Sequence, residues 1–563
     1  MVISVAKRQM GTILLVLVPL VTFIIDPWTS YDGINIPKLS MLVVSAAILA
    51  ALLVVDFRLL FESRYRITVV LSAIFKIDLL FVLLSGPGPF NEQFFGTNGR
   101  NTGYLTYLCL LILFFAAVVS LDTKRSEKLV WSLLSIGALS IFYGLLQSFK
   151  LDPFKWNNPY SPVLGFLGNP DFQSSLLGIC GVAAFALLFR ARAHMKIRSS
   201  LVVYLLLSVY VIAKTRAQQG FLVFLAGIAI VLFTFLLKNK RTKKLSFAYL
   251  ALVIASGFLV VIGSLNKGPL AHYLYKVSLT YRGDYWRAAW KMTTQHPLTG
   301  VGLDSYGNWY RLTRDMAATI RRGPEVTSNA AHNVFLDFSS NGGFPLLIAY
   351  VLIVGYALVS AIKVIKRTEG FDSVHTALFG AWVAYQLQSL ISINQIGLAV
   401  WGWVLSGALV AYEITTRDVG NLTKLVKRKG SAKAKTINQP ANSPASLIAI
   451  FIGITVGFGL SLPPYLADAS LRSALKSGST AKLEKAVKRW PVDETRLFYG
   501  AQLLYTSHLE SHALALNEFV ANRDPHFYYG WQGISTNSTA TAAQKSEALA
   551  HMKALDPHNP NLK

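Results

Sequence analysis

Long apolar stretches separated by short polar segments dominate roughly the first 460 residues of this 563-residue chain. A helix needs about 20 apolar residues to cross a bilayer, and most of the stretches approach that length. Their repetition predicts an all-α, polytopic membrane protein of about 12–13 transmembrane helices. The predicted spans are 11–26, 39–55, 67–85, 103–120, 129–148, 172–189, 199–213, 219–237, 246–265, 343–362, 374–396, 399–415 and 445–462.

Lys and Arg are distributed unevenly between the two sides that these spans define. If the N-terminus lies inside, the inside segments hold 27 of these residues and the short outside loops hold six. Cytoplasmic loops carry such an excess, so the odd number of spans predicts a C-terminal segment outside the cytoplasm. Topology, together with contact between the basic cytoplasmic linker 416–444 and anionic lipid headgroups, explains the net charge of +26 without a nucleic-acid partner.

The longest polar segment between spans is the predicted extracytoplasmic loop 266–342. Its part 266–332 holds nine Lys and Arg against four acids. Long loops are translocated largely regardless of their charge, so this basic loop is compatible with the topology. We expect an acidic ligand at its surface.

The last hundred residues, 463–563, are polar and helical in pattern. Three similar stretches surround Pro491, Pro525 and Pro557, at spacings of 34 and 32 residues. Helix-pair repeats of the tetratricopeptide type have a period of 34. We therefore predict a small α-helical, tetratricopeptide-like domain after the additional span 445–462, which either binds a protein partner or serves as a structural cap.

Five polar clusters on the predicted outer side supply the candidate functional residues. They surround Arg100, Asn169, Arg216, the stretch 281–307 and His332. Arginine presents a planar fork of donors that suits phosphate oxygens, and histidine suits general-base chemistry because its ordinary pKa of about 6.5 lies near working pH. The alternative for Arg216 is contact with lipid headgroups.

His332 also has an alternative interpretation. It precedes an apolar run together with Asn333, and Asn is favoured as a helix N-cap. An ionisable group at a membrane boundary is nevertheless a candidate functional residue.

Motifs of several enzyme classes are missing from the sequence. It contains no Asp-x-Asp metal motif, Walker loop, nucleophile elbow or HExxH. Cys109 and Cys180 fall inside predicted spans and offer neither a disulfide framework nor a zinc spacing. We expect no metal and no cofactor.

Several separated motifs follow one another along the chain. They are the turn Gly168-Asn169-Pro170, the turn Thr215-Arg216, the run Arg282…Trp286…His296-Pro297-Leu298…Gly300-Val301-Gly302, and AHNVFLDFSSNGGFPLLIAY from Ala331 to Tyr350. Together, in this order, they resemble the O-antigen ligase and polymerase superfamily, and the resemblance covers roughly residues 10–415. It implies a GT-C-like multi-spanning core, residues 1–415, that moves a glycan from a polyprenyl (undecaprenyl) diphosphate carrier to an acceptor hydroxyl.

The resemblance also implies a role for each candidate residue. His332 becomes the base that activates the acceptor hydroxyl, and Arg216 and Arg282 become ligands of the donor diphosphate, in an inverting reaction without metal. The other residues expected to bind substrate are Arg100, Asn169, Arg287 and Asn333.

The acceptor stays open between a glycan, a lipid and a protein. An O-antigen or exopolysaccharide polymerase and a protein O-oligosaccharyltransferase are therefore alternatives to a ligase. The resemblance implies the bacterial cytoplasmic membrane, with the active site and C-terminal domain outside. A transporter would carry paired ionisable residues deep in its spans, and only Lys76 and Asp78 fit. A membrane-anchored scaffold around the C-terminal repeats leaves the ordered outer motifs unexplained.

Overall fold

The computed structural model describes residues 4–156, 161–429 and 443–562, and these residues form helices and connecting segments without a β-strand. Eleven of the described helices are long and apolar enough to cross a membrane. The predicted class, an all-α polytopic membrane protein, is confirmed. The eleven are α1 (Val5–Phe23), α2 (Asn35–Val55), α3 (Arg66–Ser85), α6 (Thr123–Ser148), α7 (Pro170–Leu188), α8 (Met195–Thr215), α9 (Gln218–Lys238), α10 (Lys243–Ser264), α15 (Val334–Arg367), α17 (Ile396–Lys429) and α18 (Pro444–Ser477).

Two of the thirteen predicted spans form helices that differ from the others. Helix α5 (Tyr104–Ser120) has only 17 residues, and α16 (Ser373–Ile391) buries polar residues such as His375 and Gln388. Both helices are almost entirely buried among other helices. Because they are shielded from lipid, they do not need the length or apolarity of a lipid-facing span. This explains why α5 and α16 are not among the eleven described helices that meet those criteria.

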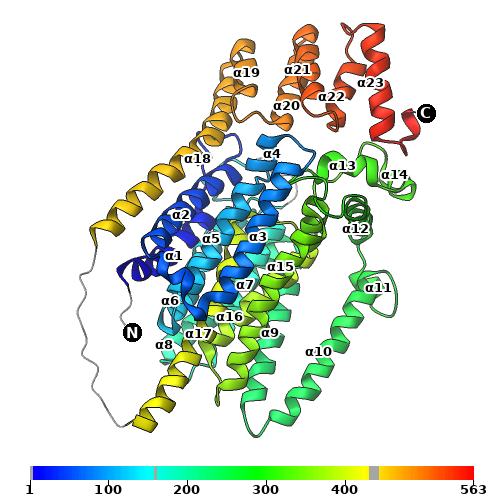
Figure 1. Ribbon diagram of the computed structural model, residues 1–563. Coiled ribbons are helices and arrows are strands. Elements are labelled where there is room, and N and C mark those ends of the chain that lie inside the picture. The colour runs from blue at the N-terminus through cyan, green and yellow to red at the C-terminus, as the bar shows by residue number, and fades with distance from the viewer. Residues whose placement is uncertain (1–3, 157–160, 430–442, 563) are drawn as a thin grey trace.

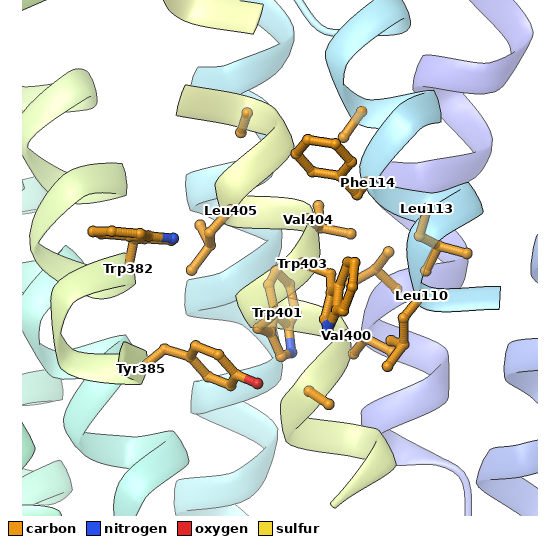
Figure 2. Close-up of a cluster of buried hydrophobic side chains, with 14 of the residues drawn as sticks. Leu110, Leu113, Phe114, Trp382, Tyr385, Val400, Trp401, Trp403, Val404 and Leu405 are labelled. Carbon is orange, nitrogen blue, oxygen red and sulfur yellow. The ribbon is translucent and has the colours of Figure 1, made fainter. Parts of the chain in front are cut away.

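The centre of the bundle is built on α17, which lies between α5 and α16 (Figure 2). Large aromatic side chains fill this region, and two of its tryptophans form side-chain hydrogen bonds. The Trp401 indole N–H donates to the Thr22 hydroxyl at 2.9 Å, and that of Trp382 donates to the Ser406 hydroxyl at 2.8 Å. A buried donor without a partner is costly, so these bonds fix how α17 is rotated against its neighbours.

Polar segments from distant parts of the sequence gather at one end of the bundle, which we call the loop end. Helices α4, α13 and α14 mark it at the upper end of the bundle in Figure 1, below the C-terminal helices labelled α19 to α23. All five polar clusters named above lie at this end. The short elements that form it are α4 (Phe90–Phe95), the 3₁₀ turn η3 (Gly165–Leu167), α11 (Ala271–Leu274), α12 (Val277–Gln295), α13 (Tyr306–Thr313) and α14 (Met316–Arg322); the 3₁₀ turns η1 (Phe57–Phe61) and η2 (Ser63–Tyr65) join α2 to α3.

Helix α15 is broken at Gly343, where the long loop docks onto it. Gly343 has a φ of +72°, and a Cβ there would lie 2.5 Å from the Pro297 carbonyl oxygen. The Phe344 N–H donates to that same carbonyl at 2.8 Å, and the Val301 N–H donates to Ser340 at 2.8 Å. Glycine tolerates this conformation and close approach, so the paired glycines of the sequence motif join the loop to the membrane helix.

The C-terminal segment begins as part of a membrane-spanning helix. Helix α18 packs along α2 and continues through Pro463 and Pro464 as far as Ser477. Successive tail helices then pack against each other in chain order. No comparison tests the tetratricopeptide-like assignment, which stays a prediction. The tail elements are α19 (Thr480–Val487), α20 (Glu494–Thr506), α21 (Glu510–Arg523), α22 (Tyr528–Ser535), α23 (Ala542–Leu555) and η4 (Pro560–Leu562).

The tail docks onto the loop end through buried polar contacts. Asp556 is fully buried between Arg311 and Arg314 of the long loop, at 2.9 and 2.6 Å. Beside this ion pair, the rings of Trp309 and His526 stack with centroids 4.4 Å apart. The predicted linker 416–444 starts inside α17, and residues 430–442 lie outside the described part of the chain.

Candidate functional site

Arg216 occupies a tight turn between two membrane helices. It caps the C-terminus of α8 with a φ of +60°, in the left-handed region, and α9 begins two residues later. The side chain is exposed and makes no hydrogen bond or ion pair with any described residue. Gly220, in the first turn of α9, approaches Ser174 of α7 so closely that a Cβ would lie 2.5 Å from the serine side chain. The turn therefore lies beside the N-terminus of α7.

The N-terminus of α7 is formed by the second predicted motif. The Asn169 side chain caps the helix by accepting a hydrogen bond from the Asp171 N–H at 2.8 Å, and Pro170 takes the first helical position. Proline is favoured there because that N–H has no helical partner. The cap fixes one face of the Asn169 amide and leaves its NH₂ group without a partner among the described residues.

Helix α12 brings Arg282 to the same place. Burial lowers the pKa of Arg282, and the negative charge of Asp171 opposes this effect. The guanidinium makes no hydrogen bond within the described ranges. Arg287, one turn later, instead forms ion pairs with Asp284 at 2.5 Å and with Asp315 at 2.9 Å. The structure thus leaves Arg282 available for a ligand and joins Arg287 to neighbouring carboxylates.

His332 lies in the segment that leads into α15. Its φ of +53° is in the left-handed region, and its ring stacks on Tyr285 of α12 with centroids 5.4 Å apart. Burial, together with the positive charges of Arg282, Arg100 and Arg322, lowers the pKa of His332 to about 4. Neither ring nitrogen has a hydrogen-bond partner in the described residues. At neutral pH the imidazole is therefore uncharged and can accept a proton.

The next residue, Asn333, caps α15 as its residue type predicts. Its side-chain oxygen accepts from the N–H groups of Phe335 and Leu336 at 3.0 and 3.1 Å, and its NH₂ group donates to the Leu390 carbonyl at 3.0 Å. Both ends of this amide are therefore used within the protein. The cap starts α15 at Val334, nine residues before the predicted span 343–362.

Arg100 is buried in a loop that wraps around one carboxylate. Asp304 accepts hydrogen bonds from the backbone N–H and hydroxyl groups of both Thr97 and Thr102. The same carboxylate lies 3.5 Å from the Arg100 guanidinium, which also donates to the Asn329 carbonyl at 2.5 Å. Two sequence clusters about 200 residues apart are thereby locked together, and Arg100 is held close to the segment that carries His332.

Several supporting residues were not among the predicted site residues. Asp337 accepts from the Ala331 N–H at 2.8 Å and so fixes the backbone next to His332. Arg322 donates to the Tyr285 hydroxyl, and its guanidinium lies 5.3 Å from the centroid of the ring on which His332 stacks. Asp337 could have been noticed as an acid in the first turn of an apolar helix, where it suits the helix dipole. The pairing of Arg322 with Tyr285 has no signal in the sequence.

The structure brings His332, Arg282 and Arg100 close enough for their charges to interact. Arg216 does not contribute to the pKa of His332 and projects from its own turn at the same end of the bundle. In the described part of the chain, no three His, Cys, Asp or Glu side chains form a group that could hold a metal ion.

Comparison with known proteins identifies the domain that contains these residues. A family model described as O-antigen ligase matches residues 201–351, the segment that includes Arg216, Arg282 and His332. No curated protein matches the chain. The resemblance seen in the sequence is thereby confirmed for residues 201–351, which match the O-antigen ligase family.

Proposed function

We propose that this protein, whose residues 201–351 match the O-antigen ligase family, transfers a glycan from a polyprenyl diphosphate carrier to an acceptor hydroxyl. The observation that carries the proposal is the position of His332, a half-buried imidazole that stacks on Tyr285 close to three arginines and has no hydrogen-bond partner among the described residues. An uncharged imidazole can take a proton from an attacking hydroxyl. The guanidinium groups of nearby arginines can donate hydrogen bonds to the oxygens of a diphosphate.

The reaction follows from these positions. His332 removes the acceptor hydroxyl proton as the oxygen attacks the anomeric carbon of the donor glycan. The bond between that carbon and the diphosphate oxygen breaks, and its electron pair stays on the diphosphate. Arg282 and Arg216 bind the departing group, so the developing negative charge is stabilised most in the transition state. Attack opposite the leaving group inverts the anomeric configuration, and the reaction uses no metal.

Arg282 and Arg216 fit this role because neither has an internal ion pair among the described residues. Both belong to segments near the N-terminus of α7, since Arg282 interacts with Asp171 and the turn that carries Arg216 packs beside Ser174. A diphosphate has two anionic groups and can bridge two such arginines. Both side chains would then be paired only when the donor is bound.

We place the protein in the bacterial cytoplasmic membrane with the loop end and the tail outside the cytoplasm. The loops at the other end of the bundle hold the excess of Lys and Arg that is typical of cytoplasmic loops, and this supports the orientation. It puts the site where lipid-linked glycans would be available in place of nucleotide sugars. Acidic lipid headgroups would then contact the basic linker on the inner face.

The same chemistry serves a ligase, an O-antigen or exopolysaccharide polymerase and a protein O-oligosaccharyltransferase. These differ in the acceptor, which is a lipid, a glycan or a protein. The linkage in the isolated product distinguishes them.

The test is reconstitution in proteoliposomes with an undecaprenyl-diphosphate-linked glycan and a panel of acceptors. The wild-type protein should form an inverted glycosidic linkage, and His332→Ala should reduce transfer by at least 100-fold, since general-base catalysis contributes roughly 10²–10⁴-fold. His272→Ala is the matched control, because His272 is an exposed residue of the same long loop. Full activity of His332→Ala would refute the assignment of the base, and loss of activity with EDTA would refute the metal-free reaction.

A further inference from the structure

A second polar feature of the loop end is a cavity of about 250 Å³. One water molecule needs roughly 10–15 Å³ of such space, so the cavity has room for a ligand much larger than water, such as one sugar ring. Five amide side chains and one arginine line it, contributed by segments that are far apart in the sequence. These residues are Asn35, Arg100, Asn169, Asn329, Asn394 and Gln395.

One wall of the cavity is held rigid by its own hydrogen bonds. Gln395 donates to the Asn35 side chain at 3.3 Å, and Asn35 donates to Asp32 at 3.0 Å. Asn394 is held between the hydroxyls of Tyr107 and Tyr385, at 3.3 and 3.2 Å. Each amide has more hydrogen-bonding capacity than these contacts use, so the wall offers fixed donors and acceptors to a ligand.

Two other amides of the cavity, the half-buried Asn169 and the exposed Asn329, have unused groups. The Asn169 NH₂ group and the whole Asn329 side-chain amide make no hydrogen bond within the described residues. Arg100 reaches the cavity through a guanidinium of which only one nitrogen is known to donate, to the Asn329 carbonyl. Unpaired amide groups next to a rigid polar wall are the expected lining for a ligand with many hydroxyls.

The charged and apolar side chains that line the cavity also favour a neutral ligand with many hydroxyls over a charged or wholly apolar one. The cavity has one basic and one acidic side chain, Arg100 and Asp32, so it does not attract a multiply charged anion as the Arg282 region does. Ile34, Leu167, Phe172 and Ile393 supply apolar side chains to the lining. A pyranose ring has hydroxyls around its edge and apolar C–H faces, which matches amides combined with an aromatic side chain. A polyprenyl chain would make no hydrogen bonds with these amides.

The two unpaired amides connect this cavity to both halves of the proposed reaction site. Asn169 lies two residues before Asp171, whose charge acts on Arg282. Asn329 lies three residues before His332 and is bonded to Arg100, whose charge acts on His332. A sugar that contacts both amides would have the proposed diphosphate ligands near one of them and the proposed base near the other, as the transferred sugar requires.

We propose that this cavity binds the pyranose ring of the donor that is attached directly to the diphosphate, through Asn169 and Asn329. The inference rests on the proposed function and adds the subsite that recognises the transferred sugar. Specificity for the sugar attached to the diphosphate is thereby assigned to amide side chains that are neither the base nor ligands of the diphosphate.

The test measures binding separately from transfer. Native mass spectrometry of the full-length protein gives dissociation constants for undecaprenyl diphosphate and for the same lipid carrying its glycan. The glycan should tighten binding to the wild-type protein. Each of Asn169→Ala and Asn329→Ala should reduce that increment by roughly 3–10-fold, the size expected for one hydrogen bond, while binding of the sugar-free lipid stays unchanged. Asn522→Ala, on an exposed position of α21, is the control and should match the wild type.

Kinetics of the same variants distinguish the donor sugar from an acceptor sugar. A raised KM for the glycan-bearing donor supports the proposal. A raised KM for the acceptor alone, an unchanged glycan increment in both variants, or equal weakening of both lipids would overturn it. If the wild-type protein binds the glycan-bearing lipid more tightly yet transfers nothing to any acceptor, the proposed function fails and the binding subsite stands.

Discussion

The protonation of His332 provides a quantitative test of the site. Its pKa of about 4 lies about 2.5 units below the ordinary histidine value of about 6.5. At 1.36 kcal/mol per unit, the folded protein disfavours the imidazolium by about 3 kcal/mol. Since the pKa is lowered by folding, the unfolded chain binds this proton first as the pH falls. We therefore expect up to about 3 kcal/mol of stability to be lost between pH 6.5 and 4, with no contribution from His332 above pH 7.

The cause of the shift predicts how a ligand changes it. Burial has the largest effect, followed by the charges of Arg282, Arg100 and Arg322. An anionic diphosphate bound to Arg282 would offset part of that positive charge and make His332 more basic. Arg282→Gln should raise the pKa of His332 in the same direction without any ligand. Burial persists in both cases, so the pKa should stay below about 6.5.

The assay is the pH dependence of carbethoxylation by diethyl pyrocarbonate, which reacts with uncharged imidazole. Peptide mass spectrometry isolates the modification of His332 from that of the other nine histidines, and a histidine peptide in the same tube corrects for reagent decay. The wild-type midpoint should lie near pH 4 and rise with undecaprenyl diphosphate. The acid limb of kcat, which reports the bound complex, should also lie at higher pH than that of kcat/KM for the donor.

Two results would refute this reasoning. A wild-type midpoint near pH 6.5 would show that the arginines and the burial do not act on His332 as the geometry requires. A midpoint that stays fixed when undecaprenyl diphosphate is bound would show that the diphosphate lies away from Arg282. Binding of the lipid is verified in the same samples by native mass spectrometry.

Three further predictions follow from particular contacts. Arg216→Lys should reduce transfer by roughly 10–100-fold, since losing the fork removes a charged hydrogen bond of about 1.5–3 kcal/mol; unchanged kcat/KM in proteoliposomes would exclude Arg216 as a ligand. Asp556→Asn should destabilise the protein by about 3–5 kcal/mol in thermal unfolding, because it leaves the buried Arg314 without a charge partner and Arg311 with only Glu325. Glu547→Gln, at an exposed position of α23, the helix that Asp556 caps, should be neutral; equal melting temperatures would contradict this. Gly343→Ala should cost about 1–3 kcal/mol from backbone strain alone and disturb the loop, whereas Gly355→Ala, in open space on the same helix, should be tolerated; similar expression and melting of the two would refute the docking argument.

The apolar pattern predicted the membrane fold well because each span is decided locally by its own hydropathy. It failed at the start of α15, where the apolar run begins at Gly343 and the helix begins at Val334. The polar first turns are stabilised by the Asn333 cap and by docking of the long loop at Gly343. A cap can be predicted from residue type, but the contact between the loop and the helix cannot.

Candidate site residues were predictable where they stand at element boundaries. Arg216 and His332 both occupy left-handed backbone positions between or before membrane helices, and the sequence motifs mark such places. Arg287 shows where prediction from sequence stops. It pairs with the carboxylate of Asp315, 28 residues later in the chain, and nothing in the sequence around Arg287 indicates this ion pair. Its predicted role in substrate binding stays a prediction. The cavity amides come together only in three dimensions, so no local pattern could have grouped them.

The position of the tail connects the last part of the chain to the proposed base. Arg311, held by Asp556 of the tail, belongs to the same short helix as Tyr310. The Tyr310 ring contacts that of Tyr285 with centroids 5.7 Å apart, and Tyr285 in turn stacks on His332. Because buried side chains are close-packed, a shift of one is felt by the next. The tail is therefore part of the structure that positions His332, whether or not it also binds a protein partner.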